Sequence, residues 1–480
     1  MIIPDYEEYQ STTGLFYHKR TDKYYSFFQK YDSVFMNTLE TTNYNEIIHN
    51  RHFPLWMLRH SLGVPGGHED YSTYVVGDHE KSREEELGYC VNSEGKLKDM
   101  DFAGISINID QGGYAHAVGP IHAGVIEPGH FRFSMKGEVI KLLMIRLGFQ
   151  KRNIREKIIN QFPVKVMPFS EVISGDSTVA YSTAFSNIYE EAMDLPISDE
   201  VKLIRMILLE LERIAIHIGD MGAIAGDIGY YPLHGLCATD RGVPLGVMEA
   251  LTGSRFGRGA IFPGEVRLNP RLKTEDLKKL ANNIHIVFKR VEKHFLRATR
   301  TSTIRERLHD CGKITKLDVL KNGFVGMPAR CTGMKQDMRY SEPLYQDGSV
   351  PLGLNIESEY LNGDAWARFY LRYLEYKNSC LWLENVIPNI DITKSGRGKL
   401  IVSDVKKCRP GLYYKSIEGW RGPVLVALDL SKDCKILDSY IRDPSVTNWH
   451  ALELSVRGEL IGDFPLNNKS FNLSYVGFDL

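Results

Sequence analysis

Residues 171–185 read Glu-Val-Ile-Ser-Gly-Asp-Ser-Thr-Val-Ala-Tyr-Ser-Thr-Ala-Phe, a tight Ser-x-x-Ser turn that leads into a helix-like run. Near the C-terminus, residues 442–448 read Arg-Asp-Pro-Ser-Val-Thr-Asn. A Cys-x-x-Cys pair at each of these two places would hold a soft metal through four thiolates. Hydroxyls and an amide are hard, neutral and weak ligands, so we expect no nickel or zinc site here. The four positions concerned are Ser174, Ser177, Ser445 and Asn448.

The composition bounds the class of protein. The chain has 480 residues, 43% of them hydrophobic, enough for about two to four structural units and a sizeable core. Lys and Arg number 59 against 60 Asp and Glu, a net charge of −1, so the charge does not indicate nucleic-acid binding. No apolar run approaches the ~20 residues that span a bilayer, and the N-terminus does not read as a signal peptide. We expect partner proteins to hold the chain at any membrane.

The cysteines are scattered and form no Cys-x-x-Cys pair. This spacing predicts free thiols in a reducing cytosol, and neither a disulfide set nor an iron–sulfur site. The seven cysteines are Cys90, Cys237, Cys311, Cys331, Cys380, Cys408 and Cys434.

In their order and spacing, the motifs from residue 119 to 480 resemble those of the large subunit of energy-converting, membrane-bound nickel–iron hydrogenases. There the two segments carry Cys-Gly-x-Cys and Asp-Pro-Cys-x-x-Cys. The chain also resembles the sister family, the quinone-cavity subunit of respiratory complex I, whose C-terminal segment reads Arg-x-Pro-Ser as residues 442–445 do. The resemblance implies a peripheral subunit on the cytoplasmic face of the inner membrane. It also implies a partner subunit with a [4Fe–4S] cluster and membrane-embedded, ion-translocating subunits.

The first shared motif lies at residues 119–133, Gly-Pro-Ile-His-Ala-Gly-Val-Ile-Glu-Pro-Gly-His-Phe-Arg-Phe. The alternating run that begins at His130 predicts a hairpin strand. The resemblance implies that His130, and less directly His122, caps a quinone head group and donates a proton or hydrogen bond to its carbonyl. The alternative is a turn histidine bonded to the backbone.

Ser198, followed by two acids, predicts the start of a long helix with an apolar stripe at steps of three and four. Both sister families carry its Glu-Leu-x-Arg-x-x-x-His motif, here Glu210, Arg213 and His217. The complex I resemblance places a proton-relay aspartate on Asp227, and a carboxyl in such an apolar, Gly-rich stretch is expected to have a raised pKa. The alternative is an exposed aspartate at the helix end.

Further matches to the two families concern loops and the cavity. Arg255 belongs to a segment that lies near the neighbouring subunit's cluster in complex I, with a structural role as the alternative. Other matched positions are expected to order loops through ion pairs, and two more are expected to line the substrate cavity. The loop residues are Arg330, Asp337 and Arg339; the cavity residues, with Ser174, are Tyr181 and Arg421.

The fold class that follows is mainly α: a central helix bundle with a small N-terminal β region and a C-terminal α+β unit. We expect an unassigned α+β region over 1–115, which includes a strand over 102–110, and a β-hairpin segment over 116–148. The helical bundle then covers 149–390 and the α+β unit 391–480.

Three functions remain open. In the first, the chain is a redox subunit without a metal of its own that passes electrons from the partner cluster to a quinone. His130, Asp227 and His217 would then supply protons. In the second, it is a degenerate scaffold or coupling subunit, favoured by Asp176 and by Trp420, which would polarise or fill the cavity. The third, an active hydrogenase, is disfavoured by the four missing thiolates.

Overall fold

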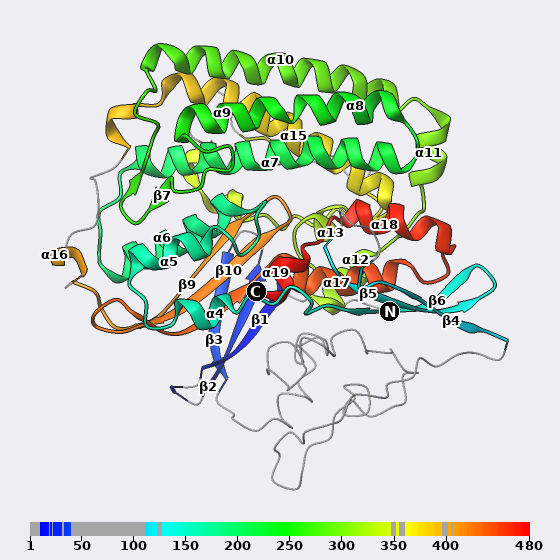
Figure 1. The fold of residues 1–480 in the computed structure, drawn as a ribbon, viewed down its shortest axis with the longest axis horizontal. Helices are drawn as coiled ribbons and strands as arrows, with labels where there is room; N and C mark the ends of the chain where they lie inside the picture. The colour runs from blue at the N-terminus through cyan, green and yellow to red at the C-terminus, as the bar shows by residue number, and fades with distance from the viewer. Residues whose placement is uncertain are drawn as a thin grey trace, which may run out of the picture.

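Long helices stacked over small antiparallel sheets make up the computed structural model (Figure 1). It describes residues 10–18, 20–21, 23–30, 33–39, 112–121, 127–346, 352–354, 361–395, 402–405 and 407–480. His122 and the strand predicted over 102–110 lie outside these ranges. The prediction of a mainly α chain with small β regions is confirmed. Within the described ranges, no helix is both long and apolar enough to cross a membrane.

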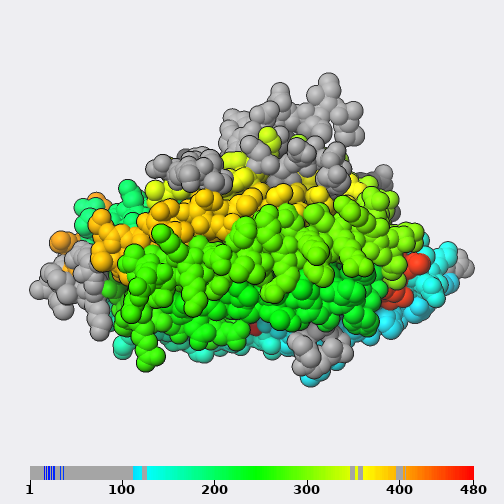
Figure 2. Space-filling model, turned by 90° about the horizontal axis from the view of Figure 1, so that it is seen from above, coloured from blue at the N-terminus to red at the C-terminus, as the bar shows by residue number. Residues whose placement is uncertain are grey.

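Five helices form the upper layer, which faces the viewer when the molecule is seen from above (Figure 2). The central helix, α7, begins where the Ser198 hydroxyl accepts a hydrogen bond from the Val201 amide (3.3 Å), as the capping pattern predicts. Its apolar stripe is buried against its neighbours, because residues three and four apart share one helix face. The five are α7 (Asp199–Asp227), α8 (Tyr231–Asp240), α9 (Gly242–Thr252), α10 (Thr274–Ala298) and α15 (Ala365–Val386).

Below this layer, α6 (Thr178–Ala192) packs on a three-stranded sheet. The sheet has the order β11-β10-β9 and is antiparallel throughout, so β9 lies at its edge. Its strands are β9 (Gly411–Glu418), β10 (Pro423–Leu430) and β11 (Ile436–Arg442). The turn between β9 and β10 carries Trp420 and Arg421 back toward the start of α6.

The N-terminal strands pack against the opposite face of this sheet. Phe27 stacks on Tyr440 with ring centroids 5.7 Å apart, and His18 Nε2 lies 2.9 Å from the buried carboxylate of Asp429. The N-terminal sheet therefore joins the C-terminal one, although some 400 residues separate them in the chain. Its strands are β1 (Gln10–His18), β2 (Lys23–Lys30) and β3 (Ser33–Leu39).

A third sheet packs on the C-terminal helices. Strand β5 begins at His130, as predicted, and its Phe131 and Phe133 form an aromatic cluster with Trp449 and Phe464. The elements are β4 (Tyr114–Val118), β5 (His130–Lys136), β6 (Val139–Arg146), α17 (Pro444–Ser455), α18 (Phe464–Phe471) and α19 (Tyr475–Asp479).

Short elements connect these layers. The helices are α4 (Ile154–Ile158), α5 (Pro163–Ser170), α11 (Ser302–Leu308), α12 (Lys316–Asn322), α13 (Met327–Arg330), α14 (Pro343–Gln346) and α16 (Val402–Val405). The two-residue strands are β7 (Ile261–Phe262) and β8 (Glu265–Val266), and the 3-10 turns are η2 (Met338–Ser341), η4 (Ile387–Asn389), η5 (Ile392–Lys394) and η6 (Ile461–Asp463).

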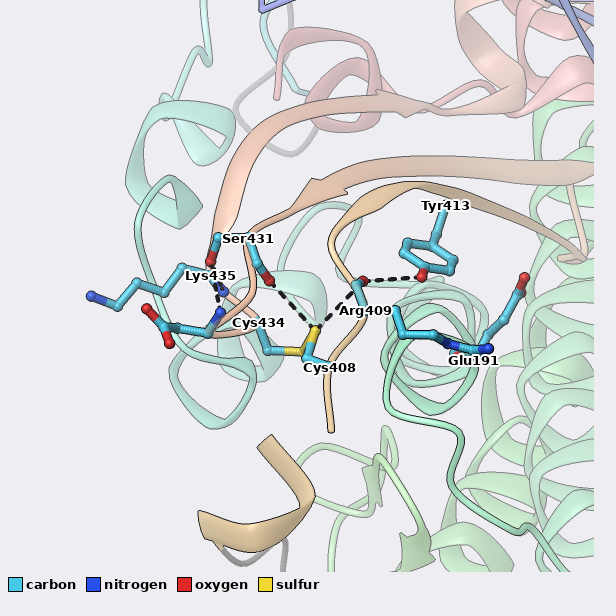
Figure 3. The surroundings of a disulfide bond; sticks show 8 residues. Glu191, Cys408, Arg409, Tyr413, Ser431, Cys434 and Lys435 are labelled. Atoms are coloured by element: carbon cyan, nitrogen blue, oxygen red, sulfur yellow. Dashed lines mark hydrogen bonds between the residues drawn. A yellow bond between two sulfur atoms is a disulfide. The ribbon is translucent and has the colours of Figure 1, made fainter. Parts of the chain in front are cut away.

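A disulfide corrects the prediction that all the cysteines are free thiols. Cys408, which precedes β9, is bonded to Cys434 in the turn between β10 and β11 (Figure 3). Sheet pairing brings the two Cα atoms to 5.6 Å, a separation that a disulfide spans. The other cysteines of the described ranges are buried free thiols: Cys237, Cys311, Cys331 and Cys380.

Candidate functional site

The site begins at the turn between α5 and α6. The Ser177 amide donates to the Ser174 carbonyl oxygen (3.0 Å), which closes the Ser-x-x-Ser turn, and both serines are buried. The Ser174 hydroxyl donates to Asp176 Oδ1 at 2.8 Å and lies 3.0 Å from the Ser474 hydroxyl. The turn thus presents hydroxyls and one carboxylate at the start of a helix.

Arg421 faces this turn from the β9–β10 hairpin. Its guanidinium binds Asp176 through two parallel contacts, Nη1 to Oδ1 and Nη2 to Oδ2, each 2.7 Å long. The Trp420 indole also donates to the Asp176 carbonyl oxygen (2.8 Å). Burial, the largest single effect, would raise the pKa of the Asp176 carboxyl, but the Arg421 charge together with the hydrogen bonds from Arg421 and Ser174 holds this pKa below its ordinary value.

The second segment reaches the site through α17. The Ser445 hydroxyl accepts a hydrogen bond from the Ser474 amide (2.8 Å), which links it to Ser174 through one residue. Tyr181 donates to the Asp443 carboxylate (2.7 Å) at the start of the same helix. We call Ser174, Asp176, Arg421, Ser445 and Ser474 the serine–arginine site.

Within the described residues, Asn448 makes no hydrogen bond to the other three positions. Its amide group is bonded on both sides to the Val325 backbone, at 3.2 Å to N and 3.1 Å to O. The donors at the four positions are thus hydroxyls and an amide with hydrogen-bond partners of their own, which does not fit a nickel–iron centre. Among the described residues, no group of three or more His, Cys, Asp and Glu is arranged to hold a metal ion.

A chain of polar contacts leads from the serine–arginine site toward the end of α7. Arg421 Nε donates to the Asn472 carbonyl oxygen (2.7 Å), and the Asn472 side chain donates to buried Asp220 (2.7 Å). Lys469 lies 4.0 Å from Asp220. Partial desolvation raises the pKa of Asp227, as predicted, while the Lys469 charge opposes the rise. The Asp227 side chain is exposed, as in the alternative prediction.

The two predicted proton-handling histidines lie in different surroundings. His130 is half-buried, and its Nδ1 lies 3.1 Å from the Gly119 carbonyl oxygen, the turn contact named as the alternative. His217 is fully buried on α7, and desolvation lowers its pKa. Ten residues of helix separate His217 from Asp227, or ~15 Å along the axis, so no proton passes directly between them.

The residues expected to order loops meet in one buried ionic network under α7. Glu375 lies at its centre, 3.0 Å from His217 Nε2 and 2.8 Å from Arg330 Nε. Arg339 joins Asp337 (2.7 Å) to Glu210 (3.3 Å). The network thus connects α7 and α15 with the loop at 330–339.

Arg213 ties this network to the serine–arginine site. It pairs with Glu210 at 3.1 Å and donates to the carbonyl oxygens of Glu418 (2.7 Å) and Gly419 (3.1 Å). These are the residues just before Trp420 and Arg421, so Arg213 braces the turn that carries them. Arg255, by contrast, is exposed in the loop after α9, where the Gly259 amide donates to Glu171 (2.7 Å).

Glu212 is a functional candidate that sequence reasoning missed. Its Oε2 accepts a hydrogen bond from the Val179 amide (2.8 Å) in the first turn of α6, while its buried Oε1 has no partner within the described residues. Desolvation, with the negative Asp176 nearby, raises the pKa of Glu212 to about 8. The sole signal in the sequence is an acid inside a mostly apolar helix.

With this geometry established, the comparisons with known proteins decide the family. The family described as "Respiratory-chain NADH dehydrogenase, 49 Kd subunit" matches residues 227–479, more than half of the chain. The chain belongs to this family. Its relatives include the membrane-bound hydrogenase subunit alpha of Pyrococcus furiosus, 29% identical over 64% of this chain and 73% of that protein. Another is a subunit of the NADH-quinone oxidoreductase of Koribacter versatilis, 24% identical over 72% of this chain and 90% of that protein.

A solved structure shares the fold of this 49 Kd family member. The structure of the membrane-bound sulfane sulfur reductase, an archaeal respiratory membrane complex, contains a chain that matches with a TM-score of 0.69. The match covers 78% of this chain and all of that one, at 20% sequence identity. The relatives are subunits of oxidoreductase complexes of membranes, and this chain is an oxidoreductase subunit of that kind.

Proposed function

We propose that the chain is the redox subunit of a membrane-bound complex and carries no nickel–iron centre. Electrons come from a [4Fe–4S] cluster of a partner subunit and pass to a quinone at the serine–arginine site. Membrane-embedded partners couple the reaction to ion translocation, and the subunit lies peripherally on the cytoplasmic face. The observation that carries the proposal is the donor set: Arg421 with surrounding hydroxyls in place of metal ligands.

This donor set suits a reaction in which negative charge develops on a carbonyl oxygen. Two electrons, passed one at a time through the cluster, and two protons convert a quinone into a quinol, and both quinone oxygens become hydroxyls. A guanidinium and fixed hydroxyls stabilise the charge that appears on the oxygen before the proton arrives. Arg421 is held by Asp176 and by the Asn472 carbonyl oxygen. Its guanidinium is therefore oriented before the reaction, and no free energy is needed to orient it in the transition state.

Protons are proposed to reach the site by two routes. His130 stands at the start of β5 and is the proposed donor to the quinone, together with His122. The second proposed route runs from Asp227 toward the site by way of Asp220, the buried carboxylate that the Asn472 side chain and Lys469 contact. His217 is proposed to act on Arg421 through the neighbouring Trp420, whose ring centroid lies 6.3 Å from its own.

A non-catalytic scaffold is the second candidate function. It is favoured by the two-contact pairing of Arg421 with Asp176 and by the Trp420 hydrogen bond, which close the turn onto the hairpin. In that case the network under α7 would serve to transmit motion between partner subunits.

Reoxidation of the purified complex separates the two candidates. The iron–sulfur chain is reduced, a short-chain quinone is added, and cluster reoxidation is followed by absorbance. We expect saturable reoxidation that Arg421→Met slows at least tenfold, a loss of about 1.4 kcal/mol or more of transition-state stabilisation. Arg305→Met, on the exposed face of α11, is the control and is expected to react as the native complex does.

The outcome assigns the function. Absence of reoxidation by quinone would refute the quinone proposal. The same assay with a sulfane-sulfur compound then tests a second oxidant, the one after which the structurally similar sulfane sulfur reductase is named. Absence of reaction with both would leave the scaffold function.

A further inference from the structure

A cavity lies away from the serine–arginine site. It is a groove of about 710 Å³ between α6, the start of α7, η2 and the edge strand β9. Its walls include Thr183, Arg205, Met338, Ser416 and Glu418, and none of the five residues of the serine–arginine site. Its volume falls within the range of ligand-binding clefts.

The edge of β9 provides main-chain hydrogen-bonding groups to this groove. Gly419 and Gly422 exchange both backbone hydrogen bonds (2.9 and 3.2 Å), which sets the phase of the antiparallel ladder. Every second residue of β9 therefore directs its N–H and C=O away from β10. Consistent with this, the Glu418 carbonyl oxygen accepts a hydrogen bond from Arg213 on that outer side. The next outward residues are Ser416, Tyr414 and Leu412, whose backbone groups have no hydrogen-bond partner within the described chain.

Three buried polar atoms in the groove also lack partners. In the part of the chain that the structure describes, Thr183 Oγ1, Arg205 Nε and Ser416 Oγ make no hydrogen bond. Thr183 is only 7% exposed and Arg205 only 3%. A buried donor or acceptor without a partner costs ~1–3 kcal/mol. A ligand that places polar groups in the groove supplies the missing partners and removes this cost.

The walls carry five acidic and five basic side chains, and three of the acids are paired with basic side chains of the walls. Glu190 is bound by Arg205, Lys415 contacts Glu191 at 2.5 Å, and Asp194 lies 3.8 Å from Arg409. These pairs leave no surplus of either sign, so the groove does not select a charged ligand. A row of free strand groups beside a neutral cleft matches the chemistry of an extended peptide main chain.

We propose that an extended, uncharged segment of a partner subunit adds to this sheet as a fourth strand beside β9. The segment enters the groove at Ser416 and continues along the edge of β9, where its N–H and C=O groups pair with Ser416, Tyr414 and Leu412. The Cys408–Cys434 disulfide ties the start of β9 to the next hairpin (Figure 3), so the edge is held in place before the segment binds.

Amide hydrogen exchange in the whole complex, compared with the full chain alone, tests the proposal. Strand addition protects the outward amides of Leu412, Tyr414 and Ser416 at least tenfold in the complex. Those of Lys415 and Ile417, which already point to β10, change little and are the internal control. Equal exchange of the three outward amides in chain and complex would overturn the proposal. A small molecule found in the groove while they remain unprotected would overturn it too.

A matched pair of variants gives a second readout. Ser416→Pro removes the outward N–H without removing a bond to β10, because proline is tolerated on an edge strand. Ser416→Ala keeps the N–H. We expect both variants to retain the thermal unfolding temperature of the native chain, and only the proline variant to lose a partner subunit on purification, at least tenfold. Full assembly of a folded Ser416→Pro chain contradicts the proposal; if that chain does not fold, the exchange experiment decides.

Discussion

Replacing Glu212 by Gln should stabilise the protein in a way that depends on pH. Burial raises the pKa of this carboxyl from its ordinary value of 4.5 to about 8. A carboxyl with a raised pKa contributes stability that is fully present below pH 4.5 and is lost as the pH rises toward 8. Gln imitates the protonated acid: its carbonyl oxygen accepts the Val179 amide and its NH2 group replaces the acid O–H.

The magnitude follows from the two pKa values. Between pH 4.5 and pH 7 the carboxyl is ionised in the unfolded chain but stays protonated in the folded one. The free energy of unfolding of the native chain therefore falls by 1.36 kcal/mol per pH unit, or about 3 kcal/mol in all. For 480 residues the entropy of unfolding is roughly 1 kcal/mol/K, so the unfolding temperature of Glu212→Gln should exceed that of the native chain by ~3 °C at pH 7. The difference should approach zero near pH 4 and reach its maximum above pH 8.

Thermal unfolding of both chains, followed by circular dichroism from pH 4 to 9, measures this difference. Glu306→Gln, an exposed position on α11, is the control and should show no pH-dependent difference. A Glu212→Gln variant that is destabilised equally at every pH would refute the reasoning. It would mean that Glu212 is ionised in the folded protein and binds the start of α6 as a carboxylate.

Three further predictions concern the disulfide and the serine–arginine site. Cys408→Ser opens a loop closed over 26 positions and should lower the free energy of unfolding by about 3.5 kcal/mol. The variant should unfold at a lower temperature than the native chain, and reductant should not lower that temperature further. An unfolding temperature equal to that of the native chain would contradict this. Arg421→Met leaves the Asp176 carboxylate unpaired and should lower the free energy of unfolding by about 3 kcal/mol. This value is at the low end for a buried ion pair because the Asp176 side chain is 34% exposed. Adding Asp176→Asn should restore most of the lost free energy, and full additivity in the double-mutant cycle would show that the pair contributes nothing. Because hydroxyls and an amide do not hold nickel, elemental analysis of the purified complex should find it at background, and one nickel per chain would disprove this.

Local signals made the helical part of the fold predictable. Ser198 with its two following acids marks the start of α7, and the apolar stripe after it has the period of a helix. The turn at Ser174 and the hairpin strand at His130 follow from equally short patterns. Each of these features is decided by residues within a few positions of one another.

The features that could not be predicted depend on contacts distant in sequence. Arg421 and Asp176 are 245 positions apart, and Cys408 meets Cys434 only because three strands pair in register. The contact of Glu212 with the Val179 amide depends on how α7 crosses the start of α6. No spacing rule reports such meetings, since they are products of tertiary packing.

The ionic network under α7 has a consequence for heat tolerance. The ion pairs Arg213–Glu375 and Arg372–Asp220 join α7 to α15 and are almost fully enclosed, so at room temperature the loss of hydration offsets much of their attraction. The hydration of charged groups becomes less favourable on heating, and this penalty shrinks accordingly. The contact between α7 and α15 therefore weakens less on warming than a purely apolar interface of the same size. The junction between the helical layer and the hairpin that carries Arg421 should be among the last parts of the molecule to separate as temperature rises.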